Sequence, residues 1–504
     1  FTTAVDKIVL NRFLGLPIFL FVMYLMFLLA INIGGALQPL FDVGSVALFV
    51  HGIQWIGYTL HFPDWLTIFL AQGLGGGINT VLPLVPQIGM MYLFLSFLED
   101  SGYMARAAFV MDRLMQALGL PGKSFVPLIV GFGCNVPSVM GARTLDAPRE
   151  RLMTIMMAPF MSCGARLAIF AVFAAAFFGQ NGALAVFSLY MLGIVMAVLT
   201  GLMLKYTIMR GEATPFVMEL PVYHVPHVKS LIIQTWQRLK GFVLRAGKVI
   251  IIVSIFLSAF NSFSLSGKIV DNINDSALAS VSRVITPVFK PIGVHEDNWQ
   301  ATVGLFTGAM AKEVVVGTLN TLYTAENIQD EEFNPAEFNL GEELFSAVDE
   351  TWQSLKDTFS LSVLMNPIEA SKGDGEMGTG AMGVMDQKFG SAAAAYSYLI
   401  FVLLYVPCIS VMGAIARESS RGWMGFSILW GLNIAYSLAT LFYQVASYSQ
   451  HPTYSLVCIL AVILFNIVVI GLLRRARSRV NIELLATRKS VSSCCAASTT
   501  GDCH

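Results

Sequence analysis

The chain of 504 residues has 56% hydrophobic and only 12% charged residues, and its mean hydropathy is +0.68. Soluble domains carry about 45–50% apolar and about 25% charged residues, so the composition excludes an ordinary soluble enzyme and a disordered protein. The formal net charge of −1 excludes a nucleic-acid binder, because such proteins present a strongly basic surface. The composition predicts an all-α polytopic membrane protein embedded in lipid.

Apolar runs long enough to cross a bilayer recur along the chain, since a span needs about 20 residues. We expect about eight to ten transmembrane helices, with duplicated gate-like repeats that contain Pro/Gly-broken or re-entrant segments. Val43–Leu60 and Trp65–Leu82 fit either spans or interfacial helices. The clear candidates are Phe13–Ile33, Val85–Phe97, Leu152–Phe178, Ala183–Leu204, Phe242–Phe260, Trp299–Leu322, Tyr396–Ala414, Trp423–Ala446 and Tyr454–Leu473.

Basic residues orient membrane proteins, because short loops rich in Lys and Arg stay in the cytoplasm. Such clusters lie at 143–151, at 205–248 and after the last span, so both termini are expected in the cytoplasm. The predicted regions are the end of a cytoplasmic spacer at 1–12, a first membrane half at 13–204, a basic cytoplasmic loop at 205–241, the start of a second half at 242–322, an acidic insert at 323–395, the rest of that half at 396–473 and a tail at 474–504.

The acidic insert at 323–395 differs in composition from the rest of the chain. A solvated linker is the usual structure of such a charge run, and an amphipathic helix is expected around Leu340–Phe359. Its side of the membrane stays open at this stage. A re-entrant Tyr396–Ala414 would place it in the cytoplasm with parallel repeats, whereas a re-entrant Trp299–Leu322 would place it outside with inverted repeats.

Two short motifs each occur twice in the same order, which indicates duplicated halves. Ser138–Ala142 recurs as Ser410–Ala414, each copy after a Val-Pro pair and a nearby cysteine. Gly102–Arg106 is echoed by Gly308–Lys312. Many transporters are built from such repeats, with the substrate site where the repeats meet.

Cys134 and Cys408 lie at Pro-containing breaks in these repeats. Pro and Gly free backbone groups, and broken backbone survives at membrane depth only against protein or a water-filled cavity. Thiols favour transition metals over Mg²⁺ or Ca²⁺. Cys134, the neighbouring Asn135 amide and Cys408 are therefore predicted ligands of a dehydrated cation, although a single buried cysteine more often only fills space.

Three further sulfur residues are weaker candidates for the same path. Cys163 is expected in the middle of the Leu152–Phe178 span, where close helix packing is the alternative. Met104 and Met310 are repeat-related and could extend a path of sulfur atoms, but a methionine is more often a flexible core residue.

Charged residues within apolar runs are costly and normally face the protein interior. Glu99 and Glu313 are candidates for oxygen ligands or proton carriers, and the alternative is structural ion pairing with Arg166 or Lys312. The tail contains a separate group that could bind metal in the cytoplasm, with a disordered tail as the alternative. This group is Cys494, Cys495, Cys503 and His504.

Four separated motifs in this order resemble the membrane part of the FeoB family, the bacterial ferrous iron transporters, in its enterobacterial form. They are Glu99–Arg106, Gly133–Pro137, Ala311–Val315 and Val406–Cys408, within a resemblance that extends from Val9 to Arg479. The resemblance implies that Cys134 and Cys408 are gate cysteines and that Glu99 is the acidic membrane residue of the family. It also implies Fe²⁺ as the substrate and the bacterial inner membrane as the location.

The resemblance further implies a cytoplasmic N-terminal GTP-binding domain, in which GTP and Mg²⁺ would bind. No credible Walker motif precedes the first span, so this domain is expected to be missing before Phe1 and the chain alone is predicted not to be an enzyme. The implied partners are that domain, small cytoplasmic accessory Feo proteins and further copies of the chain.

The resulting prediction is transport of ferrous iron through repeat-related cysteines at helix breaks, normally coupled to or gated by the GTP-binding domain. A carrier for another divalent metal is one alternative, because N/O/S sites generally bind Zn²⁺ and Cu²⁺ more tightly than Fe²⁺. A carrier for a nucleoside-like solute and a membrane scaffold for the missing domain are the others.

Overall fold

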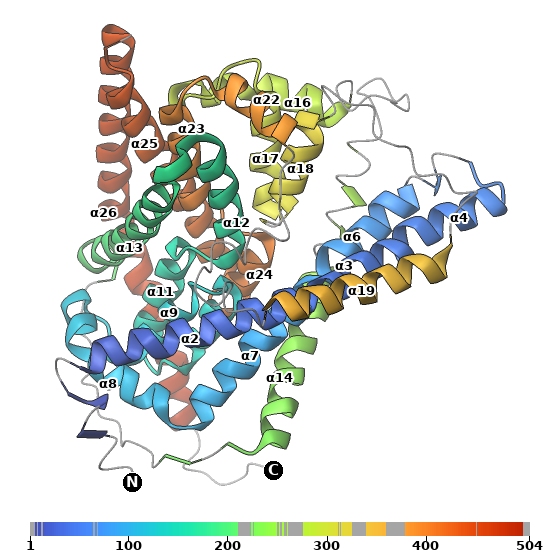
Figure 1. The fold of residues 1–504 in the computed structure, drawn as a ribbon. Coiled ribbons are helices and arrows are strands. Elements are labelled where there is room, and N and C mark those ends of the chain that lie inside the picture. The colour runs from blue at the N-terminus through green and yellow to red at the C-terminus, as the bar shows by residue number, and fades with distance from the viewer. Residues whose placement is uncertain are drawn as a thin grey trace.

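The computed structural model describes most of the chain, and every regular element in the described part is a helix (Figure 1). This confirms the predicted all-α class. Side chains are described as far as 475. The described residues are 6–209 without 8, 12–13, 64–65 and 68; 223–256 without 225, 249–250 and 253–254; 260; 276–324 without 311 and 313; 339–358; 379–449; and 451–496.

Six helical segments in the described part are long and apolar enough to cross a membrane, which confirms the polytopic prediction. In the last of them, none of the most apolar 18-residue stretch is buried inside the protein. That surface therefore suits contact with lipid. The six segments are Pro17–Thr59, Pro148–Phe178, Gly182–Tyr206, Ala392–Glu418, Arg421–Ala446 and Pro452–Arg475.

The N-terminal helices form an arm that carries the helix of the acidic insert. The expected amphipathic helix is α19 (Leu340–Thr358), which lies along α3 (Figure 1). His51 Nδ1 and Glu343 Oε2 are 2.9 Å apart across this contact. The elements of the arm are α2 (Gly15–Ala36), α3 (Gln38–Ser45), the π-helix η1 (Val46–His51), α4 (Gly52–Thr59), the π-helix η2 (Phe69–Gly75) and α6 (Gly76–Val81).

The first repeat is divided into short helices. Leu152–Phe178 was expected as one span, but α11 ends at Met157 and α12 begins only at Gly164. Pro159 lacks the N–H that a continuing helix needs, which explains the break. The elements are α7 (Leu84–Asp100), α8 (Tyr103–Leu118), η3 (Gly122–Ser124), α9 (Phe125–Val130), α10 (Asn135–Gly141), η4 (Ala142–Thr144), α11 (Pro148–Met157), η5 (Ala158–Phe160), α12 (Gly164–Phe173), η6 (Ala174–Phe178), η7 (Gly179–Asn181) and α13 (Gly182–Tyr206).

The second repeat contains a helical hairpin. Trp299–Leu322 forms two helices, α17 and α18, that pack against each other. Gly308 makes this approach possible, because a Cβ there would lie 2.7 Å from Val315 Cγ2. The hairpin fits the re-entrant alternative for this segment, while the expected span Phe242–Phe260 lies partly outside the described residues. The elements are α14 (Val228–Phe242), η8 (Val243–Gly247), α16 (Ala277–Ile285), η10 (Thr286–Ile292), α17 (Trp299–Met310), α18 (Val314–Thr324), α22 (Thr379–Phe389), α23 (Ala392–Leu404) and α24 (Ile409–Glu418).

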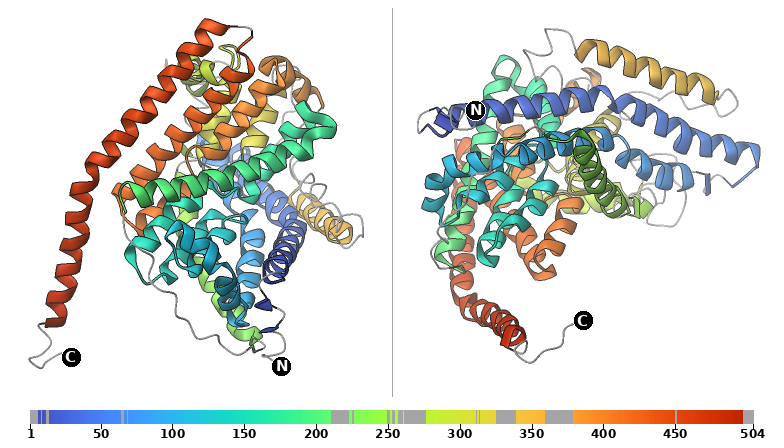
Figure 2. Two further views of the ribbon diagram at one scale, coloured as in Figure 1. Left: turned by 90° about the vertical axis from the view of Figure 1, so that its left-hand side faces the viewer. Right: turned by 90° about the horizontal axis from the view of Figure 1, so that it is seen from below.

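The core is centred on α23, whose side chains from Tyr398 to Leu404 are all buried. Tyr398 stacks on Phe173 of the first repeat, with ring centroids 5.3 Å apart. The two halves therefore share one hydrophobic core rather than forming separate units. Two long helices complete the bundle, α25 (Arg421–Ala446) and α26 (Pro452–Ala496), and α26 runs along its outside (Figure 2).

Candidate functional site

Cys134 lies at the break between α9 and α10. Its backbone is extended (φ −153°, ψ 132°), and it is the N-cap residue of α10. Gly131 is required here, because a Cβ would lie 2.8 Å from the Leu128 carbonyl oxygen. The predicted break in the first repeat is therefore present, and the thiol stands at the end of a helix.

Cys163 lies at a second break in the same repeat, as the N-cap residue of α12. The Gly164 N–H donates to the Gly133 carbonyl oxygen at 3.2 Å and joins the two breaks directly. The Asn135 Nδ2 donates to the Met161 carbonyl oxygen at 3.3 Å. Cys163 is therefore held beside the Cys134 break. The expectation that it lies in the middle of a continuous span was wrong.

Arg166 stabilises this second break. Its side chain is fully buried, and Nη1 donates to the carbonyl oxygens of Pro159 and Met161 at 3.1 and 2.8 Å. These carbonyl groups have lost their helical partners, so the guanidinium replaces the missing N–H donors. These hydrogen bonds of Arg166 are thus with the main chain, whereas the sequence suggested pairing with an acid as an alternative.

Cys408 occupies the matching position in the second repeat, as the N-cap residue of α24. Tyr405, at the end of α23, has extended ψ (−156°). Its hydroxyl donates to the Leu305 carbonyl oxygen at 3.2 Å and anchors the break to α17. Because α24 packs against α10, the breaks of the two repeats face each other.

The three cysteines line one cavity of about 80 Å³, which we call the thiol cavity. A water needs about 10–15 Å³ of such space, so the cavity has room for an ion and a few waters. The Asn135 Oδ1 is buried and accepts no hydrogen bond from any described residue. The lining residues are Ala30, Gln87, Ile88, Met91, Gly133, Cys134, Asn135, Cys163, Gly164, Ala165, Lys312, Cys408 and Val411.

The thiols share a cavity without forming a closed metal site. Among the residues that the structure describes, no three His, Cys, Asp or Glu side chains are grouped closely enough to hold a metal ion. Transport sites must bind an ion well enough to admit it and weakly enough to release it. Three soft ligands around one cavity, with an amide oxygen beside them, fit that requirement.

Glu99 and Met104 line a different cavity, of about 450 Å³, which we call the basic cavity. Glu99 is half exposed and accepts a hydrogen bond from Arg238 Nη2 at 2.9 Å. At the same cavity, Arg143 Nε donates to Glu418 Oε2 of the second repeat at 3.2 Å. The structure therefore does not bring Glu99 or Met104 to the cysteines, although both lie beside a cavity.

The remaining predicted residues lie wholly or partly outside the described part. The side chain of Met310 and all of Glu313 are not described. In the tail group, Cys494 and Cys495 are described only as backbone of α26, and Cys503 and His504 lie beyond it. Gln87, Met91 and Lys312 line the thiol cavity but were not predicted as path residues. The one signal for Gln87 was a polar amide inside an apolar run.

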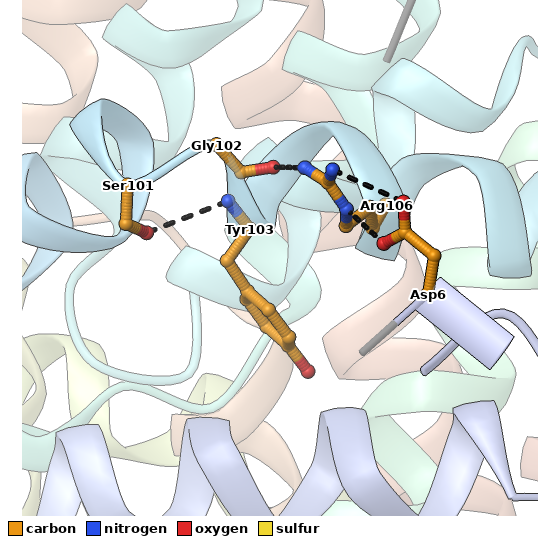
Figure 3. Close-up of polar contacts among 5 residues, drawn as sticks. All are labelled: Asp6, Ser101, Gly102, Tyr103 and Arg106. Atoms are coloured by element: carbon orange, nitrogen blue, oxygen red, sulfur yellow. Dashed lines mark hydrogen bonds and ion pairs between the residues drawn. The ribbon is translucent and has the colours of Figure 1, made fainter. Parts of the chain in front are cut away.

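The repeat-related cations Arg106 and Lys312 have different surroundings. Arg106 is fully buried, and its Nε and Nη2 donate to Asp6 at 2.5 and 3.3 Å (Figure 3). Its Nη1 donates to the Gly102 carbonyl oxygen at 2.8 Å, and its guanidinium lies 3.7 Å from the centre of the Tyr223 ring. Lys312, 3% exposed, lines the thiol cavity with its ammonium 5.1 Å from the centre of the Tyr405 ring.

Comparison with known proteins agrees with this architecture. The family model described as "Gate: Nucleoside recognition" matches residues 81–177 and 243–421, which include both repeats and all three cavity cysteines. A model described as "Ferrous iron transport protein B C terminus" matches residues 186–238. The Fe(2+) transporter FeoB of Shigella flexneri is 99% identical over all 504 residues of the chain. The chain belongs to the FeoB family.

Other FeoB proteins extend the comparison. The Fe(2+) transporter FeoB of Salmonella typhimurium is 94% identical over the whole chain, and that of Legionella pneumophila is 50% identical over 485 residues, or 94% of the chain. The chain spans 65% of the length of the Shigella and Salmonella FeoB proteins and 63% of that of Legionella. No solved structure matches the chain.

Proposed function

We propose that this chain carries ferrous iron across the bacterial inner membrane through the thiol cavity. The observation that carries the proposal is the convergence of Cys134, Cys163 and Cys408, each the N-cap residue of its helix, on one small cavity. Each lies at a break, where the chain leaves the regular helix. The names of the relatives, all Fe(2+) transporters, support the choice of metal.

The coordination chemistry follows from the cavity wall. An ion that enters must lose most of its water, and the thiols and the Asn135 Oδ1 replace part of it. A thiol binds a metal well only after losing its proton, so binding releases protons. Two thiolates neutralise the charge of Fe²⁺, and helix N-termini favour negative charge at such positions. The positive charge of Lys312, which also lines the cavity, disfavours binding of a second cation.

The size of the thiol cavity argues against a nucleoside as its ligand. Pockets for small organic molecules usually enclose about 300–1,000 Å³, and this cavity has about 80 Å³. A membrane scaffold is also a poor fit, since it needs neither broken helices nor thiols facing a cavity. Another divalent metal remains an alternative, because Zn²⁺ binds N/O/S sites more tightly than Fe²⁺, and parallel uptake measurements decide between them.

Charge supports an orientation with the basic cavity in the cytoplasm. Lys123, Arg143 and Arg238 line that cavity, and basic residues mark the cytoplasmic side. Helices α8 and α14 lie at this end of the molecule, and α16 and α22 lie at the opposite end (Figure 1). We infer that both termini are cytoplasmic and that the insert emerges outside, as the hairpin α17–α18 favours.

In the whole protein, we expect transport to be coupled to or gated by an N-terminal GTP-binding domain, in which GTP and Mg²⁺ would bind. This assigns no enzymatic step to the chain itself. Small cytoplasmic Feo accessory proteins and further copies of the chain are the other proposed partners.

The test is anaerobic uptake of Fe²⁺, Mn²⁺ and Zn²⁺ into liposomes that contain the chain. Cys134→Ser and Cys408→Ser are each expected to reduce Fe²⁺ uptake at least about tenfold, because a weak hydroxyl ligand replaces sulfur. Cys458→Ser is the matched control, since Cys458 is a partly exposed thiol on α26 and does not line the cavity. Uptake at the parent rate in the Cys134 and Cys408 variants would rule the proposal out.

A further inference from the structure

The two cavities lie in sequence along one face of α7. Ile88 and Met91 line the thiol cavity, and Tyr92, Leu95 and Glu99 line the basic cavity. These positions share one side of the helix, because residues three and four apart are neighbours on its surface. At a rise of about 1.5 Å per residue, Met91 and Glu99 are about 12 Å apart along the helix axis.

The break in the first repeat connects the same two cavities. Gly133, Cys134 and Asn135 line the thiol cavity, and Val130 and Pro137, on either side of them, line the basic cavity. Two separate elements, α7 and the α9–α10 break, thus form walls of both spaces. An ion that leaves the cysteines along these walls reaches the basic cavity next.

Tyr92 lines the basic cavity, and it follows directly on α7 after Met91, which lines the thiol cavity. Its side chain is 2% exposed, and its hydroxyl has no hydrogen-bond partner among the described residues. The phenol is within electrostatic range of Cys134, which lines the thiol cavity, and of Arg143 and Arg238, which line the basic cavity. A buried hydroxyl without a partner is unusual in a native structure, and here it stands where the path would pass.

We propose that Tyr92 closes the way between the thiol cavity and the basic cavity, and that the basic cavity is the exit of the same path. This inference rests on the proposed function, because it names the route of the transported ion. Rotation of the ring joins the two spaces. The hydroxyl oxygen can then bind a passing cation without breaking a hydrogen bond.

The basic cavity is suited to an exit because Glu99, the carboxylate in its lining, is held loosely. Glu99 and Arg238 are 49% and 33% exposed, and exposed ion pairs contribute little stability. A divalent ion that arrives from the cysteines attracts Glu99 more strongly than the singly charged guanidinium does. We therefore assign Glu99 the role of receiving the ion after it leaves the thiols, which explains its place beside the second cavity.

Thiol labelling tests the barrier without iron. The chain is placed in liposomes, an impermeant maleimide is added on the side of the basic cavity, and labelling of the Cys134 peptide is followed by mass spectrometry. Tyr92→Ala is expected to label about tenfold faster than the parent, because an open state of small population becomes the main one. Tyr92→Phe, which keeps the ring, is expected to label at the parent rate.

Leu95→Ala is the matched control, since it enlarges the basic cavity on the same face of α7 and leaves the tyrosine in place. An unchanged rate in Tyr92→Ala would overturn the proposal, as would equal acceleration in Leu95→Ala. Should Tyr92→Ala not elute as folded protein, Tyr92→Leu replaces it, because leucine keeps apolar packing and is smaller than the ring.

Iron uptake then tests the exit. Glu99→Gln is expected to leave Cys134 labelling unchanged and to slow Fe²⁺ uptake several-fold, and uptake at the parent rate would remove Glu99 from the path. The two proposals fail separately. A parent chain that takes up no iron counts against the proposed function, whereas the labelling rates decide the position of the barrier in either case.

Discussion

Arg106 and Lys312 come from the same duplicated motif, yet the two halves of the molecule use them differently. Arg106 is bonded to the carboxylate of Asp6 and to a main-chain carbonyl, and it lies under the ring of Tyr223. Lys312 lines the thiol cavity near the ring of Tyr405. Both cations are buried beside a tyrosine. The first joins three chain segments, and the second places its charge at the wall of the thiol cavity.

Both copies of the motif thus have a buried cation beside a tyrosine, but the contacts of the two cations differ. A charge that is matched by a carboxylate and hydrogen bonds contributes to the structure. A charge at a cavity wall influences what enters the cavity. The two copies should therefore respond to mutation in opposite ways, one in stability and the other in ion binding.

The largest expected effect is on stability at Arg106. Arg106→Met leaves the Asp6 carboxylate, 19% exposed, without its partner, and breaking a buried pair costs about 3–5 kcal/mol. The measurement is thermal unfolding of the chain in detergent. Lys312→Met is the matched variant and should lower the midpoint much less. Similar midpoints for the two variants would show that the copies do not differ in this way.

The second prediction concerns Lys312 and ion binding. Lys312→Met removes a positive charge from the wall of the thiol cavity. Fe²⁺ should then bind about tenfold or more tightly, since charge interactions at an effective dielectric of about 20 reach a few kcal/mol at short range. Anaerobic equilibrium binding measures this, and Lys312→Arg, which keeps the charge, is the control. Unchanged or weaker binding by the methionine variant would contradict the assigned role.

The smallest expected effect is at the ion pair that joins the two repeats. Arg143 and Glu418 are 54% and 12% exposed, and partly exposed pairs contribute about 0–1 kcal/mol. Glu418→Gln should therefore change the unfolding midpoint far less than Arg106→Met does. A loss as large as that of Arg106→Met would show that the junction of the repeats, rather than the Asp6 contact, carries the stability.

The sequence was sufficient to predict two of the three cavity cysteines in their correct setting. Cys134 follows Gly133 and Cys408 follows Pro407, and both residue types disfavour a continuous helix. The same pattern in both repeats strengthened the prediction. The chain around Cys163 contains the same signals in Pro159 and Gly164. The prediction gave more weight to the length of the apolar run than to these two residues, so it missed the break.

Distances across the bundle could not be predicted in this way. Glu99 was grouped with the cysteines because both lie in membrane segments, but on α7 it is more than two turns from Met91 at the cavity wall. Lys312 was treated as an ion-pair partner, since a sequence shows that a charge is buried and not what it faces. Periodicity identifies a helix and its faces, whereas which helix faces which depends on packing between distant segments.

The hydrogen bond from Gly164 to Gly133 has a mechanical consequence. Because this hydrogen bond joins main-chain atoms only, it holds Cys134 and Cys163 together regardless of what their side chains bind. Cys408 belongs to the other repeat and has its own anchor on α17. If one repeat moves relative to the other, Cys408 is expected to move away from the pair Cys134 and Cys163, because only that pair is joined by this main-chain hydrogen bond. The affinity of the three thiols for a metal ion would then depend on how the two repeats are positioned.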